Sequence, residues 1–516
     1  MHIFLYGPSG SGKSTIGKLL ARSLDLLFLD LDAEIEKHIG QTISKSIFEK
    51  GEDAFRDVES DLLEQNITGF EKVIALGGGA LLRTKNQKLA QEYGQVVFLE
   101  ADENTIISRL KKDPNKRPLL AGELESSLKQ LLKKRHAHYA SFPLRIDASN
   151  APELVSWDIQ RKLGRYHLHK MGAGYDVVVQ DDGLGSIGEL LKVRDISGPM
   201  LLVSDSNVAP IYAERVLTSL QSAGFIASSQ TFPAGETNKT IGTVATIWHG
   251  CLQANLDRKS TIIALGGGVV SDLAGFSAAT FMRGCRWVSV PTTLLAMVDA
   301  SIGGKTGFDL PEGKNLIGAF YPPSFVLADP DVLSTLPERE LRAGLAEVVK
   351  HGVIADRDLF NLCTQGWDAV TENLSELVRR GMAVKVKVIE EDPYEQGVRA
   401  ALNYGHTVGH AVEVVSNFNL LHGEAVAIGM VVEARLAERI SIAETGMADN
   451  IASALFGLDL PTRIPVDLPQ EQIILAMNKD KKKSNGLIRF ALPVKIGEVK
   501  IGVEIKNLLS VLEEMK

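Results

Sequence analysis

Residues 7–14, with the sequence GPSGSGKS, constrain the fold more than any other part of this chain. They satisfy the P-loop pattern G-x-x-x-x-G-K-S and lie between the apolar run 3–6 and the amphipathic stretch 14–24. A P-loop requires a strand before it and a helix after it, because the turn and the helix N-terminus bind phosphate together. The complete pattern favours this interpretation over an ordinary glycine-rich turn. We therefore predict that the chain begins with a nucleotide-binding α/β domain.

The residues of this loop have distinct expected roles. Glycines allow successive backbone N–H groups to wrap a phosphate. Lys13 is expected to reach the β- and γ-phosphates, and the Ser14 hydroxyl to bind Mg²⁺. We expect ATP with Mg²⁺ as the cofactor of this domain, bound by Gly10, Ser11, Gly12, Lys13, Ser14 and Thr15.

Charged residues further along suggest where an acceptor substrate binds. Asp30 and Asp32 follow a short apolar run, so one carboxylate could hold Mg²⁺ through water while the other accepts a hydroxyl proton. Alternatively, Asp32 caps a helix that starts at Ala33. Arg56, Arg117 and Arg135 suit a carboxylate or a transferred phosphate, although each arginine alone is typical of a solvated surface.

Over the first 160 residues these motifs resemble shikimate kinase, which implies ATP-dependent phosphorylation of shikimate to 3-phosphoshikimate. The resemblance implies catalytic roles for Lys13, Asp32 and Arg117, with Arg117 in a lid over the phosphates and Asp30 on the metal side. One motif departs from the family. Its Arg-x-Pro-Leu-Tyr sequence reads RHAHY at residues 135–139, so the arginine and tyrosine remain without the Pro-Leu pair. The residues implied around shikimate are Asp32, Arg56, Gly78, Gly79 and Arg135.

The chain is too long for a single core. A typical domain has about 150 residues, so 516 residues predict roughly three domains. Strands alternate with helices up to about residue 165, and the basic helical stretch 157–166 with the segment 171–174 is expected to join two domains. A second alternation starts at Tyr175, and helical periodicity dominates from about residue 331. We expect domains at 1–165, 173–330 and 331–516.

Composition limits the partners and the compartment. The net charge of −8 argues against nucleic acid, because neutralising phosphates needs a basic surface. The three widely spaced cysteines fit a reducing compartment. We find neither a secretory signal nor the ~18 uninterrupted apolar residues of a membrane span. We expect a cytoplasmic protein that acts on small molecules.

Residues 265–272, LGGGVVSD, read as a strand, a glycine turn and a helix start, which is how a dinucleotide pyrophosphate is held. The G-x-G-x-x-G fingerprint is absent, so this evidence is weak by itself. Polar residues after neighbouring strands suit the ribose and adenine of a dinucleotide. The residues expected at this NAD site are Asp205, Asn207, Glu236, Lys239, Gly267, Gly268, Asp272, Thr292, Thr293, Lys305, Lys314 and Asn315.

Three histidines within 17 residues, of only 11 in the chain, indicate a metal site. They are His406, His410 and His422, and Glu347 lies on a predicted helix. A lone histidine is more often a core or capping residue, but three near a helical glutamate favour a metal. Spacing alone selects His406 and His410 as the ligand pair, because residues four apart share a helix face.

Basic residues are frequent in the same region. Lys305 and Lys350 are best placed to face a substrate with both phosphate and carboxylate, whereas residues 481–483 alone would be a solvated charge run.

From about residue 173 to the end, the chain resembles 3-dehydroquinate synthase. The resemblance implies conversion of 3-deoxy-D-arabino-heptulosonate 7-phosphate to 3-dehydroquinate and phosphate, with NAD⁺ reduced and reoxidised in each turnover. It implies Zn²⁺ (or Co²⁺) bound by Glu347, His406 and His422, which moves His410 to the substrate side. Asp299, Lys305, Lys350 and His410 would be catalytic, and Arg283 would reach the neighbouring subunit's site in a homodimer. The implied substrate residues are Arg283, Asp299, Lys305, Asn315, Lys350, Lys385, Arg399, Asn403, His410 and Lys481 or Lys482.

The expected fold class is therefore α/β: a P-loop kinase domain with a parallel sheet, a Rossmann-like NAD domain, and a mostly helical metal and substrate domain. The alternative is another small-metabolite kinase fused to a different sugar-phosphate cyclase or to a metal-dependent polyol dehydrogenase. A nucleotide-sensing regulatory module is a third interpretation, but a sensor has no need of Asp32 and Arg56. Two reactions separate the two implied activities, so we interpret the fusion as a means of co-expression.

Overall fold

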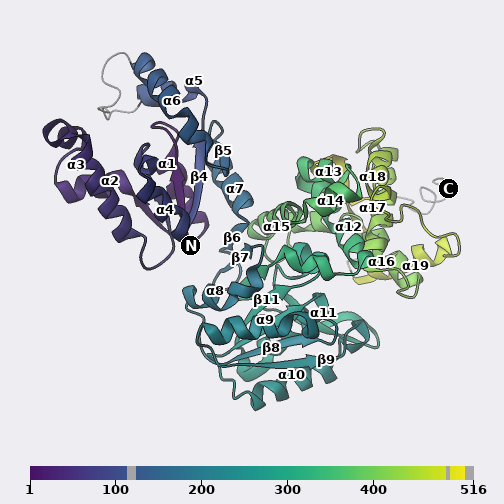
Figure 1. Cartoon of the computed structure of the whole chain (residues 1–516). Coiled ribbons are helices and arrows are strands. Elements are labelled where there is room, and N and C mark those ends of the chain that lie inside the picture. Colours follow the sequence, from purple (N-terminus) through teal and green to yellow (C-terminus); the bar gives the residue numbers. More distant parts are fainter. Residues whose placement is uncertain (113–123, 484–487, 506–516) are drawn as a thin grey trace. The chain divides into compact units, whose positions relative to one another are not determined.

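The computed structural model describes residues 1–112, 124–483 and 488–505, without the side chains of residues 124 and 478–483. The chain divides into two compact units, Met1–Leu163 and Gly164–Lys516. The first is drawn in purple and blue in Figure 1, and the second runs from blue through teal and green to yellow.

The first unit is built on a five-stranded parallel sheet with strand order β2-β3-β1-β4-β5. Its central strand is buried on both faces, as expected for a parallel sheet. Ile3 and Leu5 pack in one core with residues of the helices 13–23 and 152–163. Phe4 and Tyr6 pack in the opposite core with residues of the helices 31–39, 43–66 and 84–93. The strands are β1 (His2–Tyr6), β2 (Leu27–Asp30), β3 (Lys72–Ala75), β4 (Gly94–Glu100) and β5 (Arg145–Asp147).

Helices cover both faces of this sheet (Figure 1). They are α1 (Lys13–Ser23), α2 (Leu31–Ile39), α3 (Ile43–Asn66), α4 (Thr84–Tyr93), α5 (Glu103–Lys112), α6 (Leu124–Ala140) and α7 (Pro152–Leu163). The strand order reverses at β1, which pairs with both β3 and β4. In open parallel sheets, ligands bind beyond the carboxyl ends of the strands at such a reversal, and the P-loop follows β1 there.

The second unit contains a seven-stranded sheet with order β6-β7-β14-β11-β10-β8-β9, parallel except for the antiparallel pair β6–β7. The strands are β6 (Arg165–Leu168), β7 (Tyr175–Val179), β8 (Met200–Asp205), β9 (Ala227–Phe232), β10 (Thr261–Gly266), β11 (Arg286–Pro291) and β14 (Phe325–Ala328). The helices among them are α8 (Ile187–Val193), α9 (Ala209–Ser222), α10 (Ile241–Gln253) and α11 (Gly268–Thr280). A hairpin of β12 (Lys305–Leu310) and β13 (Gly313–Phe320) follows β11.

The rest of this unit is mainly helical. It contains α12 (Glu338–Ala355), α13 (Arg357–Cys363), α14 (Trp367–Glu372), α15 (Leu374–Glu391), α16 (His406–Val415), α17 (His422–Arg439), α18 (Met447–Phe456) and α19 (Gln470–Lys483). The hairpin β15 (Arg489–Lys495) and β16 (Glu498–Glu504) completes it. Helices α16 and α17 touch through glycines, because a Cβ on Gly409 would lie 3.0 Å from the carbonyl oxygen of Ala425, and one on Gly429 would overlap the carbonyl oxygen of Gly405.

The predicted α/β class, with a parallel sheet at the N-terminus and helices after residue 331, is confirmed. One local expectation is replaced. The helix expected to start at Ala33 starts at Leu31, and its cap is Asp30, whose Oδ1 accepts the Ala33 N–H. The stretch 157–166, expected to join two domains, contains the end of α7 and the start of β6, and the boundary between the two compact units falls inside it, after Leu163.

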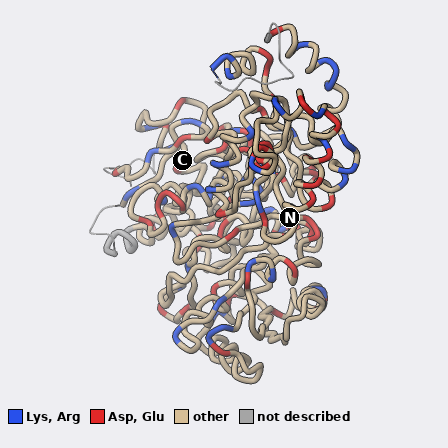
Figure 2. The backbone as a smooth tube through the Cα atoms, turned by 90° about the vertical axis from the view of Figure 1, so that its left-hand side faces the viewer, with Lys and Arg blue, Asp and Glu red and all other residues tan. Residues whose placement is uncertain are grey.

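Basic and acidic residues are interspersed along the backbone (Figure 2). Within the described part of the chain, no helix combines the length and apolar character needed to cross a membrane.

Two candidate active sites

The P-loop adopts the geometry expected from its glycines. Gly12 has φ 97°, a left-handed conformation suited to glycine, and α1 starts at the next residue. The Lys13 ammonium donates to the carbonyl oxygens of Gly7 and Pro8, both at 2.9 Å. The Ser14 hydroxyl donates to Asp30 Oδ2 at 2.5 Å, so the two groups expected near Mg²⁺ lie side by side. Thr15 is exposed in the first turn of α1.

The acceptor side of this site is organised by the glycine turn that follows β3. A Cβ on Gly79 would lie 2.5 Å from Arg56 Nη2 and 3.1 Å from Arg135 Nη2, and a Cβ on Gly77 would lie 2.8 Å from Asp32 Oδ1. The turn also borders the P-loop, because a Cβ on Gly78 would lie 3.3 Å from the Gly7 carbonyl oxygen. The fold thus gathers one carboxylate and two guanidinium groups beside the phosphate-binding loop.

Glu59 is a member of this group that the sequence analysis missed. It is fully buried on α3 and accepts from Arg56 Nη1 at 2.7 Å, while Glu52 accepts from Arg56 Nη2 at 3.0 Å. Burial raises the pKa of Glu59, although Arg56 opposes the shift. A Cβ on Gly77 would also lie 2.8 Å from Glu59 Oε1. The i,i+3 spacing of Arg56 and Glu59 on a helix was a usable indication.

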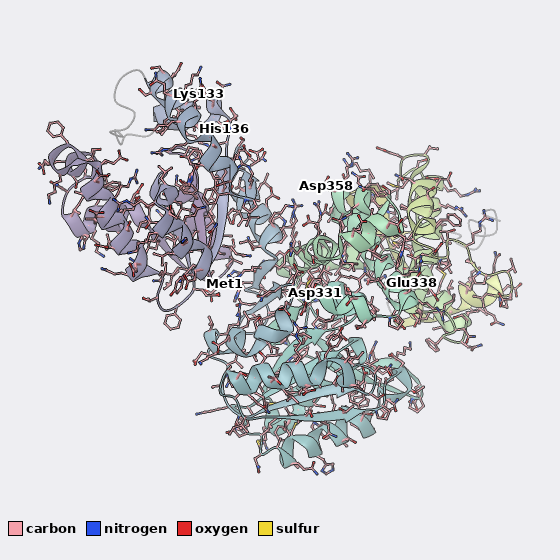
Figure 3. All side chains as sticks on the ribbon, viewed as in Figure 1. Met1, Lys133, His136, Asp331, Glu338 and Asp358 are labelled. Carbon is pink, nitrogen blue, oxygen red and sulfur yellow. The ribbon has the colours of Figure 1, made fainter. Side chains whose placement is uncertain are left out.

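Arg135 and Tyr139 bind the same carbonyl oxygen despite the altered motif. Arg135 Nη1 and the Tyr139 hydroxyl donate to the Gly78 carbonyl oxygen at 2.9 and 2.8 Å. Both side chains are buried on α6, four residues apart, whereas Lys133 and His136 lie on its exposed face (Figure 3). His138 replaces the family's leucine, and its Nε2 lies 3.1 Å from the hydroxyl of the buried Tyr6. Arg117 falls outside the described residues.

In the second unit, the glycine turn after β10 leads directly into α11, with Gly267 at the N-cap. The Thr292 N–H donates to the Gly266 carbonyl oxygen at 3.0 Å, so the loop after β11 lies against this turn. A Cβ on Gly267 would lie 3.2 Å from Thr293 Cγ2. Asp205 ends β8, which adjoins β10, and its Oδ1 accepts the N–H of Asn207 at 2.8 Å. Asp205 and the two loops therefore lie at the carboxyl ends of the neighbouring strands β8, β10 and β11.

Lys239 contacts two other residues expected at the NAD site. It is buried, and its ammonium lies 2.6 Å from Asp272 Oδ2 and 2.6 Å from Asn315 Oδ1. Burial raises the pKa of Asp272 to about 6, against the attraction of Lys239. Glu236 lies 4.0 Å from the same ammonium and 3.8 Å from that of Lys314.

Lys314 extends this network toward the histidines, because its ammonium lies 3.0 Å from Glu413 Oε1. Glu413 also has its Oε2 at 3.3 Å from His422 Nδ1.

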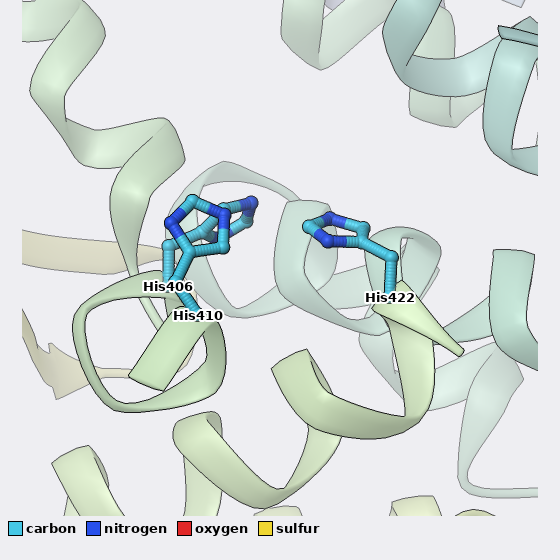
Figure 4. A group of neighbouring side chains, drawn as sticks. All are labelled: His406, His410 and His422. Carbon is cyan, nitrogen blue, oxygen red and sulfur yellow. The ribbon is translucent and has the colours of Figure 1, made fainter. Parts of the chain in front are cut away.

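The expected metal ligands meet around a buried carboxylate. Glu347 is fully buried on α12, and its Oε1 lies 3.6 Å from His406 Nε2 and 3.5 Å from His422 Nε2. Two ligand atoms bound at ~2.0–2.1 Å to a tetrahedral ion lie about 3.3–3.4 Å apart, so these separations suit a shared ion. The rings of His406 and His410 project from α16 toward His422 on α17 (Figure 4).

Outer partners orient the two histidines that face Glu347. His406 Nδ1 lies 3.2 Å from the Tyr404 carbonyl oxygen, and His422 Nδ1 lies 3.3 Å from Glu413 Oε2. Such partners fix the ring so that Nε2 carries the lone pair for a metal. His410 is exposed, and one of its ring nitrogens lies within 4.8 Å of a nitrogen of His406 and of His422, so the pair His406 and His410 that spacing alone selected also lies in this group. Glu413 was not foreseen, because its partner lies on another helix.

Cationic side chains converge next to this cluster. Lys350 pairs with Glu347, and Lys385 donates to the carbonyl oxygen of Asp299 at 2.6 Å and to its Oδ1 at 2.5 Å. Burial would raise the pKa of Asp299, but Lys385 and Lys350 together hold it below its ordinary value. His351 is buried beside this group, and burial lowers its pKa to about 3.

A loop before α16 connects further expected substrate residues. Glu395, with φ 60°, accepts from Lys305 at 2.7 Å and from Asn403 Nδ2 at 3.3 Å. Arg399 donates to the Pro393 carbonyl oxygen at 2.5 Å, and a Cβ on Gly303 would lie 2.7 Å from its Nη2. Glu395 was missed, since neither its type nor its spacing marked it.

Of the remaining expected substrate contacts, the side chain of Arg283 alone falls within the described residues. Arg283 is exposed with φ 68°. The side chains of Lys481 and Lys482 fall outside the described residues.

Comparison with known proteins agrees with both resemblances. Residues 9–163 match the shikimate kinase family, residues 229–343 the N-terminal part of 3-dehydroquinate synthase, and residues 344–483 its C-terminal part. The 3-dehydroquinate synthase of Picosynechococcus sp. is 45% identical over 334 residues, which cover 63% of this chain and 92% of that protein. The Symbiobacterium thermophilum synthase is 47% identical over 310 residues, covering 59% and 87%.

Two solved structures share the fold of the second unit. One is a 2-deoxy-scyllo-inosose synthase complexed with carbaglucose-6-phosphate, NAD⁺ and Co²⁺. It is 26% identical, with a TM-score of 0.62, and the match covers 68% of this chain and 99% of the synthase chain. A 2-epi-5-epi-valiolone synthase from Streptomyces hygroscopicus with NAD⁺ and Zn²⁺ is 28% identical, with a TM-score of 0.61, covering 66% and 97%. The predicted pair of activities is confirmed: this chain belongs to the 3-dehydroquinate synthase family and carries a shikimate kinase domain ahead of the synthase, as a bifunctional enzyme of the shikimate pathway.

Proposed function

We propose that the two residue groups described above are the sites at which the two reactions take place. For the kinase, the supporting observation is the turn 77–79, which brings Asp32, Arg56 and Arg135 together beside the P-loop. For the synthase, it is the position of Glu347 Oε1 at 3.5–3.6 Å from two histidine nitrogens.

In the kinase, Gly10, Ser11, Gly12 and Lys13 bind the nucleotide phosphates, while Ser14 and Asp30 lie on the Mg²⁺ side. Asp32 accepts the proton of the attacking shikimate hydroxyl, because its carboxylate borders the glycine turn next to the P-loop. Arg56 and Arg135 bind the shikimate carboxylate, for which paired guanidinium groups are well suited. Arg117 remains a proposed lid residue.

In the synthase, the donor set of one buried carboxylate and two imidazoles fits Zn²⁺ or Co²⁺, the ions bound by the related cyclases. A bound divalent ion would supply Lewis-acid polarisation of a substrate oxygen. Glu347, His406 and His422 would hold it, and His410, which is exposed, faces the substrate. Glu413 and the Tyr404 carbonyl keep the two imidazoles in the ligating orientation.

NAD⁺ binds along the edge formed by the loops after β8, β10 and β11. The related cyclases hold NAD⁺, and the start of α11 at Gly268 offers backbone N–H groups to a pyrophosphate. Lys239 holds Asp272 and Asn315 in place for the remainder of the dinucleotide. Lys314 connects this edge to Glu413 and hence to the metal group.

The substrate carries a phosphate and a carboxylate, and the cations beside the metal group match both. Lys350, Lys385 and Arg399 are buried, so their charges act with little screening by water. Asp299 keeps Lys385 in position, and Glu395 keeps Lys305 and Asn403 together. Asn315, Lys481 or Lys482 complete the proposed contacts.

We also propose that the chain works as a cytoplasmic homodimer through its synthase part, in which Arg283 reaches the site of the neighbouring subunit. The exposed side chain and left-handed backbone of Arg283 support this role. The net charge of −8 supports small molecules rather than nucleic acid as partners. The proposed domains remain 1–165, 173–330 and 331–516.

One experiment tests the two activities and the metal requirement of the synthase. Purified full-length protein is assayed for 3-phosphoshikimate formation with ATP and Mg²⁺, and for phosphate release from the heptulosonate phosphate with NAD⁺, before and after treatment with a chelator and dialysis. We expect synthase activity to be lost and to return with Zn²⁺ or Co²⁺, while kinase activity needs only Mg²⁺. Full synthase activity in metal-free protein would contradict the proposed metal site.

A further inference from the structure

Glu433 is a fully buried carboxylate in the middle of α17. Its Oε2 accepts the Gly405 N–H at 2.7 Å, and its Oε1 accepts the Val408 N–H at 3.0 Å. Across the described part of the chain, we find no ion pair that includes it. Ionising a buried carboxyl group without a cation is costly. Burial raises the pKa of Glu433 to about 8, although the N–H groups at the start of α16 oppose the shift, so its position at this point of the fold requires an explanation.

The two amides that Glu433 binds belong to the start of α16. Gly405 is the N-cap of that helix with φ 80°, and His406 is its first residue. The first N–H groups of a helix lack partners within the helix and carry a partial positive charge, so a carboxylate placed there is stabilised. Glu433 therefore fixes the turn of backbone from which the His406 side chain projects.

The arrangement is reciprocal between the two helices. His422 is the first residue of α17, and its Nδ1 lies 3.3 Å from Glu413 of α16. Glu433 of α17 in turn holds the first residues of α16. The glycine contacts between the helices leave little room for adjustment, because Gly429 lies directly against Gly405. Each proposed histidine ligand is thus held by a carboxylate from the opposite helix.

We propose that Glu433 is a positioning residue of the metal centre, which sets the place of His406 by binding the N-terminus of α16. The inference rests on the proposed ligand set and assigns a role to a residue that does not touch the ligand cluster. Placing a ligand within a few tenths of an ångström determines metal affinity, and outer partners of ligating residues typically contribute 10- to 100-fold.

The test compares two glutamates of the same helix. In Glu433→Gln, the amide NH₂ replaces one of the two accepting oxygens and faces a backbone N–H, so the start of α16 must shift. The matched control is Glu438→Gln, because Glu438 accepts the Ala448 N–H at 2.8 Å at the start of α18, a helix that carries none of the proposed ligands. Metal-free full-length proteins are titrated with Zn²⁺ against a competing chelator, and with Co²⁺ while the visible d–d absorption is recorded.

We expect Glu433→Gln to weaken Zn²⁺ binding about 10- to 100-fold and to alter the Co²⁺ spectrum, whereas Glu438→Gln leaves both unchanged. A variant that is less heat-stable but keeps the wild-type affinity and spectrum would show that Glu433 only supports the fold, and the inference would be wrong. If Glu433→Gln does not fold, Glu433→Asp, which keeps the carboxyl group but is one methylene shorter, is measured instead. An unchanged Zn²⁺ affinity in that variant would equally overturn the inference.

The proposed ligand set is tested separately in the same titration. If His422→Ala binds Zn²⁺ as tightly as the wild type, the metal site itself is assigned wrongly. If His422→Ala loses Zn²⁺ but Glu433→Gln does not, the site is correct and only the role of Glu433 is refuted.

Discussion

Replacing Gly79 by alanine tests whether the glycine turn of the kinase shapes the shikimate site. The added methyl group would lie 2.5 Å from Arg56 Nη2 and 3.1 Å from Arg135 Nη2. An ordinary contact needs at least 3.4 Å, so the Arg56 guanidinium must retreat by about 0.9 Å and that of Arg135 by about 0.3 Å. Arg56 is tied to Glu59 at 2.7 Å and Arg135 to the Gly78 carbonyl at 2.9 Å, so neither moves without weakening a hydrogen bond.

A misplacement of about 1 Å in a positioning group can reduce the rate about 100-fold. We therefore expect Gly79→Ala to lower kcat/KM for shikimate by about two orders of magnitude, with a large part of the loss in the KM for shikimate. The KM for ATP should change little, because the methyl group points toward the arginines. Steady-state kinetics with each substrate varied in turn give these values.

The same chain offers two controls. Synthase activity reports on the integrity of the second unit, and Gly69→Ala places a methyl group with no atom within 4 Å while straining a left-handed residue (φ 86°) of the same unit. We expect Gly69→Ala to affect stability but not the KM for shikimate. A KM for shikimate in Gly79→Ala within about twofold of the wild type would refute the geometric reasoning.

Three further predictions concern the two sites and their surroundings. Lys13→Ala should abolish shikimate phosphorylation and spare the synthase, whereas His422→Ala should abolish synthase activity, lose bound metal and spare the kinase. Assays of both reactions and metal analysis measure these outcomes. Loss of both activities in either folded variant would exclude independent sites. Burial raises the pKa of Glu59, so the folded kinase holds this proton more tightly than the unfolded chain. Its contribution to stability is therefore most favourable below the ordinary pKa of 4.5 and declines as the pH rises through the raised pKa. Urea denaturation from pH 4.5 upward should show this decline in the wild type and not in Glu59→Gln; parallel profiles would contradict it. His138→Leu leaves the buried Tyr6 hydroxyl without the partner at 3.1 Å and should cost about 1–3 kcal/mol, most of which Tyr6→Phe in the same chain should restore. Additive losses in the double variant would show that the two residues are not coupled.

Much of this protein could be predicted from short segments. The P-loop is contiguous, so its strand, turn and helix are all specified within residues 3–24. The buried strands were predicted because short apolar runs such as 73–76 and 96–99 are typical of strands in a parallel sheet that is covered on both faces. The two family resemblances added the expected site residues, and the structure brings most of those residues together.

The tertiary structure decided which side chains complete each site. Glu59, Glu395, Glu413 and Glu433 were not foreseen, because a glutamate on a helix or loop is ordinarily a solvated residue. Only Glu59 had a local indication, its i,i+3 spacing from Arg56. Their roles depend on what packs against them: Arg56 for Glu59, His422 for Glu413, and the start of a neighbouring helix for Glu433. Asp30, rather than Asp32, proved to cap α2, because hydrogen-bond direction depends on where the strand ends.

The sequence by itself therefore determined the fold class, the two activities and the residue types that the two sites use. The tertiary structure alone decided how those residues are held. Spacing along a helix predicts which side chains share a face, and it selected His406 with His410. The meeting of His406 and His422 with Glu347 requires three helices to pack at defined distances, and long-range packing of that kind is not encoded in any local pattern.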